Sequence, residues 1–326
     1  MKTLNQKIVI TALALSSLIV IPQAQAAEPT TITVPKQVAG FYQHQLGNVQ
    51  ITALLDGTNY LPPALFKGIP ATEVTKILKK YHADQAKGVQ TSVNAFLVNT
   101  GSSLVLVDSG SSSCNGPNFG SVVKNLKAAG YKPEQVDTIL LTHLHPDHVC
   151  GISDKGVASF PNATVYVADA EANYWLNPKQ AAKLPQDKQA RFKQTVEKIQ
   201  QAIHPYQATK HFKTFKLGDK IKGFDVISTA GHTPGHFSFG FKSGNKEMVF
   251  VGDIVHSHSI QFDQPETAID FDVDPKKAVQ TRLAQFARLA KQGQTVAAPH
   301  LPFPGIGHIY SKDGKSYQWI PVHFKD

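Results

Sequence analysis

Four side chains that can bind metal ions stand within six residues of this sequence. They are His143, His145, Asp147 and His148, in the stretch Thr-His-Leu-His-Pro-Asp-His-Val. So many histidines in one place make a poor building block for an apolar core. Imidazole nitrogens and carboxylate oxygens are, however, the ligands that zinc and similar divalent ions select. The stretch therefore predicts a metal site.

The spacing within this stretch favours two ions over one. Side chains two residues apart on a strand point to the same side, so His143 and His145 can reach one ion. Pro146 then turns the chain, and Asp147 and His148 are expected to open the next helix and to face a second ion. The candidates for the remaining ligands are His232, Asp253 and His300.

Short apolar runs precede most of these residues and are expected to be strands buried on both faces. The runs span residues 104–107, 138–141, 225–228, 248–251 and 295–298, and they lead to Asp108, His143, His232, Asp253 and His300 respectively. Loops at strand ends are where catalytic side chains usually lie. The runs therefore predict one shared site at the edge of a sheet.

Amphipathic helices are expected between the strands. Apolar residues recur at helical spacing from Phe192 to Ile203, and two more helices are expected over about 72–81 and 122–129. Asp274 and Pro275 are typical of a helix start and Gly293 of a helix end. The apolar stripe of that last helix comprises Leu283, Phe286 and Leu289. Interleaved strands and helices predict an α/β fold with helices on the sheet faces.

The first residues have the pattern of a secretion signal. Lys2 and Lys7 charge the start, residues 8–21 are largely apolar, and Ala24-Gln25-Ala26 is a small-x-small cleavage pattern. We expect residues 1–26 to be a signal peptide and residues 27–326 a single domain, periplasmic or secreted. An N-terminal membrane anchor is the alternative, but the apolar run is short for stable membrane insertion.

The positive charge of the chain is scattered along it. The formal net charge is +9, and Lys2 and Lys7 account for two of these charges, which leaves +7 for the mature chain. The lysines form no dense stripe, so nucleic acid is not expected as a partner.

The chain contains two cysteines, Cys114 and Cys150. An oxidising compartment would permit a disulfide between them. The sequence leaves their pairing open because it does not give the distance between them. Neither belongs to a C-x-x-C motif, so a cysteine metal site is not expected.

Taken together, the motifs resemble those of the metallo-β-lactamase superfamily. Its H-x-H-x-D-H motif stands here as residues 143–148, and its G-H-T-P-G-H element as residues 231–236. Asp253 matches the bridging carboxylate, His300 the last ligand, and Asp108 an aspartate behind the ligands. The resemblance extends from about Gln50 to the C-terminus. Within the superfamily the chain is similar to methyl parathion hydrolase and its lactonase and arylesterase relatives, whose H-L-P-F-P-G-I-G-H run matches residues 300–308.

This resemblance implies a four-layer αββα sandwich with two zinc ions per chain. One zinc would take His143, His145 and His232, and the other Asp147, His148 and His300. Asp253 and a hydroxide would bridge the two ions. The relatives also imply a homodimer.

The implied function is an exported dizinc hydrolase whose bridging hydroxide opens small apolar lactones or aryl esters, with phosphotriesters as side substrates. The alternatives are a β-lactamase and a metal-free binding or scaffold protein of the same fold. The β-lactamases with an intact H-x-H-x-D-H motif usually lack an aspartate matching Asp253. The complete set of ligands argues against the scaffold.

Several residues have more than one expected role. Asp147 or Asp253 would carry a proton to the leaving group, and the sequence does not choose between them. Asp108 is expected to orient a ligand histidine or to cap a turn. His256 stands where related lactonases carry a tyrosine that reaches the substrate carbonyl, so it is expected to donate the same hydrogen bond or to line the pocket.

The remaining candidates are weaker. His236 is expected to be structural, and His308 is expected to be structural or to lie behind the ligands. The aromatic residues Tyr174, Trp175 and Phe192 are expected either in the core or beside an apolar pocket.

Overall fold

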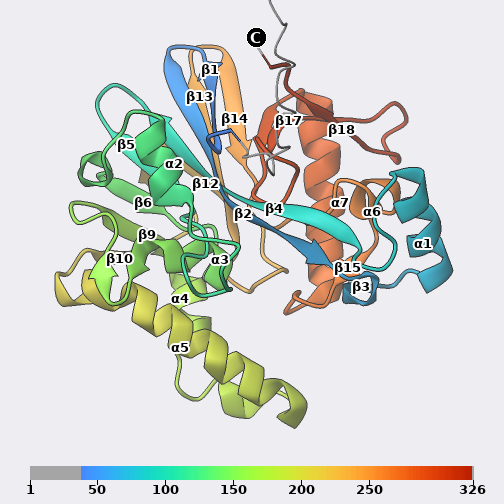
Figure 1. Cartoon of the computed structure of the whole chain (residues 1–326), viewed down its shortest axis with the longest axis horizontal. Coiled ribbons are helices and arrows are strands. Elements are labelled where there is room, and N and C mark those ends of the chain that lie inside the picture. The colour runs from blue at the N-terminus through green and yellow to red at the C-terminus, as the bar shows by residue number, and fades with distance from the viewer. Residues whose placement is uncertain (1–37, 325–326) are drawn as a thin grey trace, which may run out of the picture. The chain divides into compact units, whose positions relative to one another are not determined.

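Two seven-stranded sheets are the frame of the computed structural model, which describes residues 38–324 (Figure 1). The predicted signal peptide, residues 1–26, and the predicted domain start at residue 27 lie outside the described residues. The first sheet contains, in spatial order, β1 (Phe41–Leu46), β2 (Val49–Leu61), β4 (Val89–Asn99), β5 (Leu104–Val107), β6 (Thr138–Leu140), β9 (Thr164–Ala168) and β10 (Phe212–Phe215). The second contains β11 (Lys220–Ile221), β12 (Phe224–Ser228), β13 (Phe237–Ser243), β14 (Lys246–Phe250), β16 (Thr295–Ala297), β17 (Ile306–Tyr310) and β18 (Gln318–Pro321).

Helices and short elements fill the connections. The helices are α1 (Ala71–Lys80), α2 (Val122–Ala128), α3 (Pro146–Val149), α4 (Asp169–Trp175), α5 (Gln186–Ala208), α6 (Ile260–Asp263) and α7 (Pro275–Gln292). Two short pairs add β3 (Phe66–Lys67) with β15 (Ala268–Ile269) and β7 (Ser153–Asp154) with β8 (Val157–Ala158), and single 3-10 turns are η1 (Pro63–Leu65), η2 (Pro133–Gln135), η3 (Cys150–Ile152) and η4 (Ala181–Lys183). In the described part of the chain, no helix is both long enough and apolar enough to cross a bilayer.

Strand β5 shows how the sequence builds the layers. Its four side chains are all buried, and consecutive side chains of a strand point to opposite faces. Val105 and Val107 pack with residues of the second sheet such as Phe239, whereas Leu104 and Leu106 belong to the cluster that includes α2 and α5. A helix layer therefore covers the outer face of the first sheet, and an apolar core lies between the sheets.

Helix α7 covers the outer face of the second sheet, opposite α2 and α5 (Figure 1). Its ends are as predicted: the Asp274 side chain accepts a hydrogen bond from Lys277 N at 2.9 Å, and Gly293 follows in the left-handed conformation. The predicted apolar stripe is only partly right, because Leu283 is half-buried while Arg282 is fully buried. The order helix, sheet, sheet, helix is the predicted αββα sandwich.

All five predicted strands are present as β5, β6, β12, β14 and β16, and the predicted helices correspond to α1, α2, α5 and α7. One expectation was wrong for β12, whose Asp225 and Ile227 are half-exposed and whose Ser228 is exposed. This strand lies next to the two-residue β11 at the margin of its sheet, where one face is incompletely covered.

The strand directions explain why the predicted site residues meet. Strands β5, β6, β9 and β10 are parallel. In the second sheet β12, β14 and β16 share one direction, because β12 and β14 are both antiparallel to β13 and β14 is parallel to β16. The loops that follow parallel strands leave the same edge of a sheet. These loops carry the predicted ligands.

Candidate metal centre

His143 and His145 lie in the loop that follows β6. The prediction that a strand carries them was wrong, because the pairing of β6 with its neighbours ends at Leu140. The extended backbone nevertheless keeps the alternation of a strand: Leu144 points into the core, and the two rings turn to the same side. His143 Nε2 lies 3.0 Å from His145 Nδ1.

His232, in the loop after β12, completes the first group of ligand atoms. Its Nε2 lies 2.9 Å from His145 Nδ1. Asp253 Oδ2 lies 3.3 Å from His232 Nε2 and 3.6 Å from His143 Nε2. One donor atom from each of these four residues lies within 4.8 Å of the others, which is close enough for all of them to bind a single ion.

Asp147, His148 and His300 form a second group. Pro146 begins the four-residue helix α3, as predicted, and Asp147 and His148 follow in its first turn, with the His148 ring centroid 4.1 Å from that of His143. His148 Nε2 lies 3.3 Å from His300 Nε2, and Asp147 Oδ2 lies 3.5 Å from the same atom of His300. The two histidines are buried, but the side chain of Asp147 is 26% exposed.

The Asp253 carboxylate lies between the two groups. Its Oδ1 is 3.1 Å from His148 Nε2, and its Oδ2 is 3.1 Å from His300 Nε2. Because Oδ2 also faces His232 and His143, this carboxylate contacts members of both groups. All seven predicted ligands therefore lie in one place, in two neighbouring groups that the Asp253 carboxylate adjoins.

The ring nitrogens that point away from the centre of the site show which nitrogens are free to bind metal ions. His300 Nδ1 lies 2.9 Å from the backbone oxygen of Ser92, which can only accept, so a neutral His300 ring carries its proton on Nδ1. Its Nε2 then faces the Asp253 carboxylate at 3.1 Å, a contact that needs a proton or a metal ion between the two atoms. His148 Nδ1 is held in the same way by Asp108 Oδ2 at 3.0 Å. Such outer partners are typical of histidines that bind metals.

Burial keeps two of the histidines ready to bind cations. Burial lowers the pKa of His143 and of His145 well below the ordinary value, and the neighbouring imidazoles of His148 and His232 lower these pKa values further. Both rings are therefore neutral near pH 7 and offer lone pairs.

The carboxylates have the opposite effect on His148 and His232. Burial disfavours a charge on either ring, but Asp253 and Asp108 raise the pKa of His148 well above its ordinary value. Hydrogen bonds with Asp253 and Asp272 raise the pKa of His232 to about 9. Burial would raise the pKa of Asp253, yet the histidines around it, His148 first, hold it well below its usual range. Metal ions would displace protons from these rings on binding.

His256 contacts the same carboxylate. Its Nε2 lies 3.1 Å from Asp253 Oδ2 and must donate, because an ionised carboxylate only accepts. The ring stacks on His300 with centroids 5.2 Å apart, and Gln261 Oε1 accepts a hydrogen bond from the His256 backbone N–H. Nδ1 has no hydrogen-bond partner among residues 38–324. The predicted roles of His256 toward substrate stay predictions, and its contact with Asp253 is an addition to them.

Three further expectations can be compared with contacts. Asp108 accepts from Thr142 N at 2.9 Å as well as from His148, so it both orients a predicted ligand and holds a turn. His236 is structural as predicted: its Nε2 accepts from Asp253 N at 2.9 Å, and its Nδ1 pairs with Thr229 Oγ1 at 2.8 Å. His308 Nδ1 lies 3.2 Å from the backbone oxygen of Gln294.

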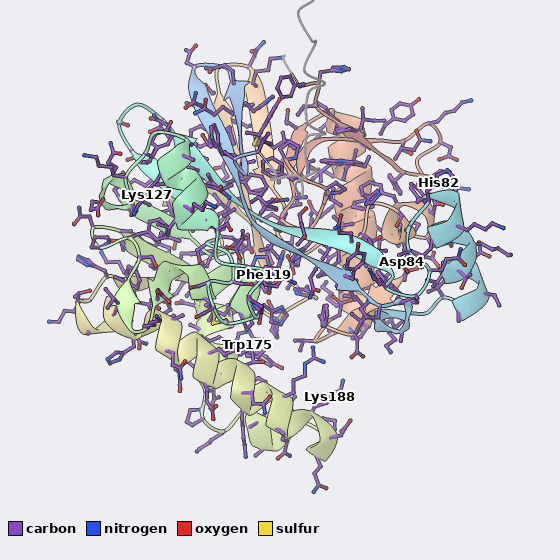
Figure 2. The ribbon with its side chains drawn as sticks, viewed as in Figure 1. His82, Asp84, Phe119, Lys127, Trp175 and Lys188 are labelled. Carbon is purple, nitrogen blue, oxygen red and sulfur yellow. A yellow bond between two sulfur atoms is a disulfide. The ribbon has the colours of Figure 1, made fainter. Side chains whose placement is uncertain are left out.

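The aromatic residues belong to the core. Trp175 is 4% exposed, lies beside α5 and stacks on Phe192 with centroids 5.0 Å apart (Figure 2). Tyr174 contacts both rings edge-on. The rim of this cluster nevertheless reaches the candidate metal centre, because the Trp175 ring meets the His145 ring edge-on at 5.3 Å.

Sequence reasoning missed Asp272 and Glu171. Asp272 Oδ1 lies 2.8 Å from His232 Nδ1, and Glu171 is fully buried with four hydrogen-bond donors around it. Asp272 stands between Asp270 and Asp274 in an alternating acidic stretch, where no motif marks the buried member. Glu171 looks like an ordinary acidic residue in the first turn of a helix.

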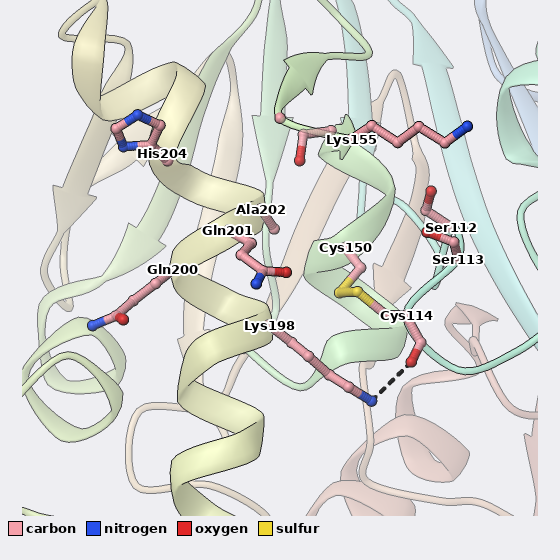
Figure 3. Close-up of a pocket in the computed structure, with 12 residues that line it drawn as sticks. Ser112, Ser113, Cys114, Cys150, Lys155, Lys198, Gln200, Gln201, Ala202 and His204 are labelled. Atoms are coloured by element: carbon pink, nitrogen blue, oxygen red, sulfur yellow. Dashed lines mark hydrogen bonds between the residues drawn. A yellow bond between two sulfur atoms is a disulfide. The ribbon is translucent and has the colours of Figure 1, made fainter.

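Cys114 and Cys150 form a disulfide, which the sequence had left open. A cavity of about 660 Å³ adjoins it, between α5 and the loops of residues 112–114 and 153–156 (Figure 3). Lys198 Nζ donates to the backbone oxygen of Cys114 at 2.8 Å, and Lys155 extends away from the disulfide (Figure 3). The basic groups of the cavity do not converge, and none of the predicted metal ligands lines it.

Known proteins are similar to this chain to different degrees. Residues 88–287 match the family described as the metallo-β-lactamase superfamily. AbOPH, described as a hydrolase in the beta lactamase superfamily, is 72% identical in a crystal structure with a TM-score of 0.88, over 89% of this chain and 100% of that one. AidC, described as a dizinc quorum-quenching lactonase in complex with the product N-hexanoyl-L-homoserine, is 28% identical with a TM-score of 0.79, over 88% of this chain and 99% of that one.

A curated relative matches less of the chain. YobT of Bacillus subtilis (strain 168), an uncharacterized protein, is 29% identical over 147 residues, which are 45% of this chain. The match spans about half of that relative, 56% of its length.

Proposed function

Because this chain belongs to the metallo-β-lactamase superfamily and is a metal-dependent hydrolase, we propose that it opens lactones and aryl esters with two zinc ions. One ion would be held by His143, His145 and His232, and the other by Asp147, His148 and His300. The single observation that carries this proposal is the position of Asp253, whose carboxylate contacts ring nitrogens of both groups at 3.1 to 3.6 Å.

Two ions in such a site lower the pKa of a water molecule and polarise the substrate oxygen that gains charge. The protein must also move a proton, and we assign this role to Asp147. Its side chain is 26% exposed and can meet a leaving group, whereas Asp253 is 3% exposed and enclosed by imidazoles. The Asp147 oxygen that does not bind the ion would accept the proton that the nucleophile loses and pass it to the departing alkoxide.

The substrate class rests on chemistry and on a relative. AidC, at 28% identity, is described as a lactonase and was solved with the product of lactone opening. A nucleophile generated between two ions can also attack phosphorus, so phosphotriesters are proposed as side substrates. Hydrolysis of a β-lactam also passes through a tetrahedral transition state in which an oxygen gains charge. β-Lactamase activity is therefore the alternative that the assay must include.

The test is a comparison of kcat/KM values for one preparation of zinc-replete protein. The substrates are dihydrocoumarin, an acyl-homoserine lactone, methyl paraoxon and nitrocefin. We expect the highest kcat/KM for a lactone, loss of activity after treatment with a chelator, and recovery when zinc is returned. Faster turnover of methyl paraoxon or nitrocefin than of both lactones would overturn the proposed substrate class.

We also propose that residues 27–326 act as a single exported domain, in the periplasm or outside the cell, and form a homodimer. The disulfide between Cys114 and Cys150 supports the export, because such bonds persist in oxidising compartments. The dimer rests on resemblance alone. N-terminal sequencing of the protein from the periplasmic fraction tests the first proposal, and light scattering of the purified protein tests the second.

A further inference from the structure

The carboxylate of Glu171 joins two loops of the candidate metal centre. It is fully buried on α4, the helix that follows β9. Its Oε1 accepts from Leu144 N at 3.0 Å and from Trp175 Nε1 at 2.7 Å. Its Oε2 accepts from Thr233 Oγ1 at 2.7 Å and from Gly235 N at 3.0 Å. Oε1 therefore binds the loop after β6 and the end of α4, whereas Oε2 binds the loop after β12.

The hydrogen bonds to Oε1 position the loop after β6. Leu144 is the residue between the predicted ligands His143 and His145, so its amide fixes the peptide that joins them. Its own side chain is buried in the core and anchors the same residue from the other side. Trp175 adds a second route, because its ring meets the His145 ring edge-on.

The hydrogen bonds to Oε2 position the loop after β12. Thr233 directly follows the predicted ligand His232, and Gly235 comes two residues later. This loop lies tightly against α4: a Cβ added at Gly235 would stand 2.1 Å from Glu171 N. The second glycine of the G-H-T-P-G-H element is therefore needed for this close approach.

A carboxylate is a costly choice at a fully buried position. Moving an ionised carboxyl out of water is unfavourable unless donors satisfy it completely. An apolar side chain would avoid this cost but would leave the amides of Leu144 and Gly235 without acceptors. Glu171 is thus suited to holding two loops in a fixed relation.

We propose that Glu171 is a positioning residue that sets the distance between the loop of His143 and His145 and the loop of His232, so that their three ring nitrogens converge on one metal ion. The proposal rests on the metal site of the proposed function but not on its substrate. The proposal predicts that loss of the carboxylate weakens the binding of one metal ion more than the binding of the other.

The substitution Glu171→Gln has an asymmetric consequence. The new NH2 group cannot face Leu144 N and Trp175 Nε1, which only donate. It must face the other side, where the Thr233 hydroxyl can turn to accept but Gly235 N cannot. The variant should therefore keep the loop of His143 and His145 and loosen the loop of His232.

The experiment measures binding of cobalt(II) alone to metal-free protein, by chelator competition and by the visible absorption of each bound ion. For Glu171→Gln we expect one cobalt site weakened about 10- to 100-fold with a changed spectrum, and the other close to wild type. Thr233→Val removes one donor and keeps the carboxylate, so it should weaken the same site by less. This second variant tests the proposal even if Glu171→Gln does not fold.

The matched control is Asn125→Ala, which removes a buried amide on α2 that bonds Gly40 N and Leu55 O and contacts neither loop. It should lower Tm and leave both cobalt sites unchanged. If Glu171 only stabilised the fold, Glu171→Gln would behave like this control, or would weaken both sites equally, and the proposal would be wrong. Wild-type protein that binds no cobalt would overturn the metal site itself.

Discussion

The Nδ1 atom of His232 lies 2.8 Å from Oδ1 of Asp272, and this contact fixes which nitrogen of the ring faces the candidate metal centre. Because an ionised carboxylate only accepts, Nδ1 carries a proton, and Nε2 is turned toward His145. The second oxygen of Asp272 accepts from Ile269 N at 3.0 Å. One oxygen of Asp272 is therefore fixed by the backbone, while the other oxygen orients the His232 ring.

Asp272→Ala should weaken metal binding at the His232 group by about 10- to 100-fold, because the ring loses the partner that orients it. Chelator competition measures the effect. Asp270→Ala is the matched control: Asp270 is two residues away, exposed, and paired with Lys67 and Arg191 at 3.7 and 3.6 Å. Equal effects of the two substitutions would contradict the role of Asp272.

Asp253→Asn should lose most of the activity and bind fewer metal ions per chain. An amide has one acceptor oxygen, so it cannot serve the two groups that Asp253 Oδ1 and Oδ2 face. Metal analysis and kcat are measured on the same sample, with Asp263→Asn as the control, since Asp263 pairs with Lys80 away from the site. Wild-type rates with one ion lost would rule out a bridging Asp253.

The clustering of the seven candidate ligands was predictable because their signals are local. Each apolar run of strand type ends shortly before a histidine or aspartate, and parallel strands bring such ends together whatever the length of chain between them. This is why Asp253 and His300, far apart in sequence, were placed with His143. The end of β6 at Leu140 was missed, because apolar character extends one residue beyond the pairing.

The residues behind the ligands were not predictable, because their roles depend on tertiary contacts. Arg282 interrupts an apolar stripe and would be expected at the surface, yet it is buried. Its guanidinium donates to the backbone oxygens of Ile254, Pro265 and Thr267, which lie in the segment after Asp253. No pattern within the helix indicates these acceptors. The same holds for Asp272 and Glu171.

The stability contributed by Asp56 should fall as the pH rises from about 4 to about 6. Burial raises the pKa of this carboxyl from 3.8 to about 6, although the amides of Ser111 and Gly120 favour its charged form. The folded state thus holds the proton more tightly than the unfolded state, so stability is greatest below pH 4 and this share is lost above pH 6. The shift corresponds to at most about 3 kcal/mol.

The measurement is the free energy of unfolding of metal-free wild type minus that of Asp56→Asn, whose side chain does not titrate, between pH 4 and pH 7. The difference should decrease across this range. A difference that grows with pH would show that the carboxylate, held by Ser111 and Gly120, is the favoured form in the folded protein.

The disulfide between Cys114 and Cys150 should contribute strongly to stability. It links residues 36 apart in the sequence, and closing a loop of that length in the unfolded chain is worth about 4 kcal/mol. Urea unfolding of Cys114→Ser/Cys150→Ser measures the loss, and wild type unfolded with excess reductant should match it. A loss below about 1 kcal/mol would mean that removing the disulfide adds little conformational entropy to the unfolded chain.

The most direct test of a two-metal hydrolase is the rate of lactone hydrolysis as zinc is added stepwise to metal-free protein. Two groups of ligands that share Asp253 predict a rate that rises with added zinc and stops rising at two equivalents per chain. Hydrolysis by metal-free protein, or a rate that is complete at one equivalent, would contradict the account.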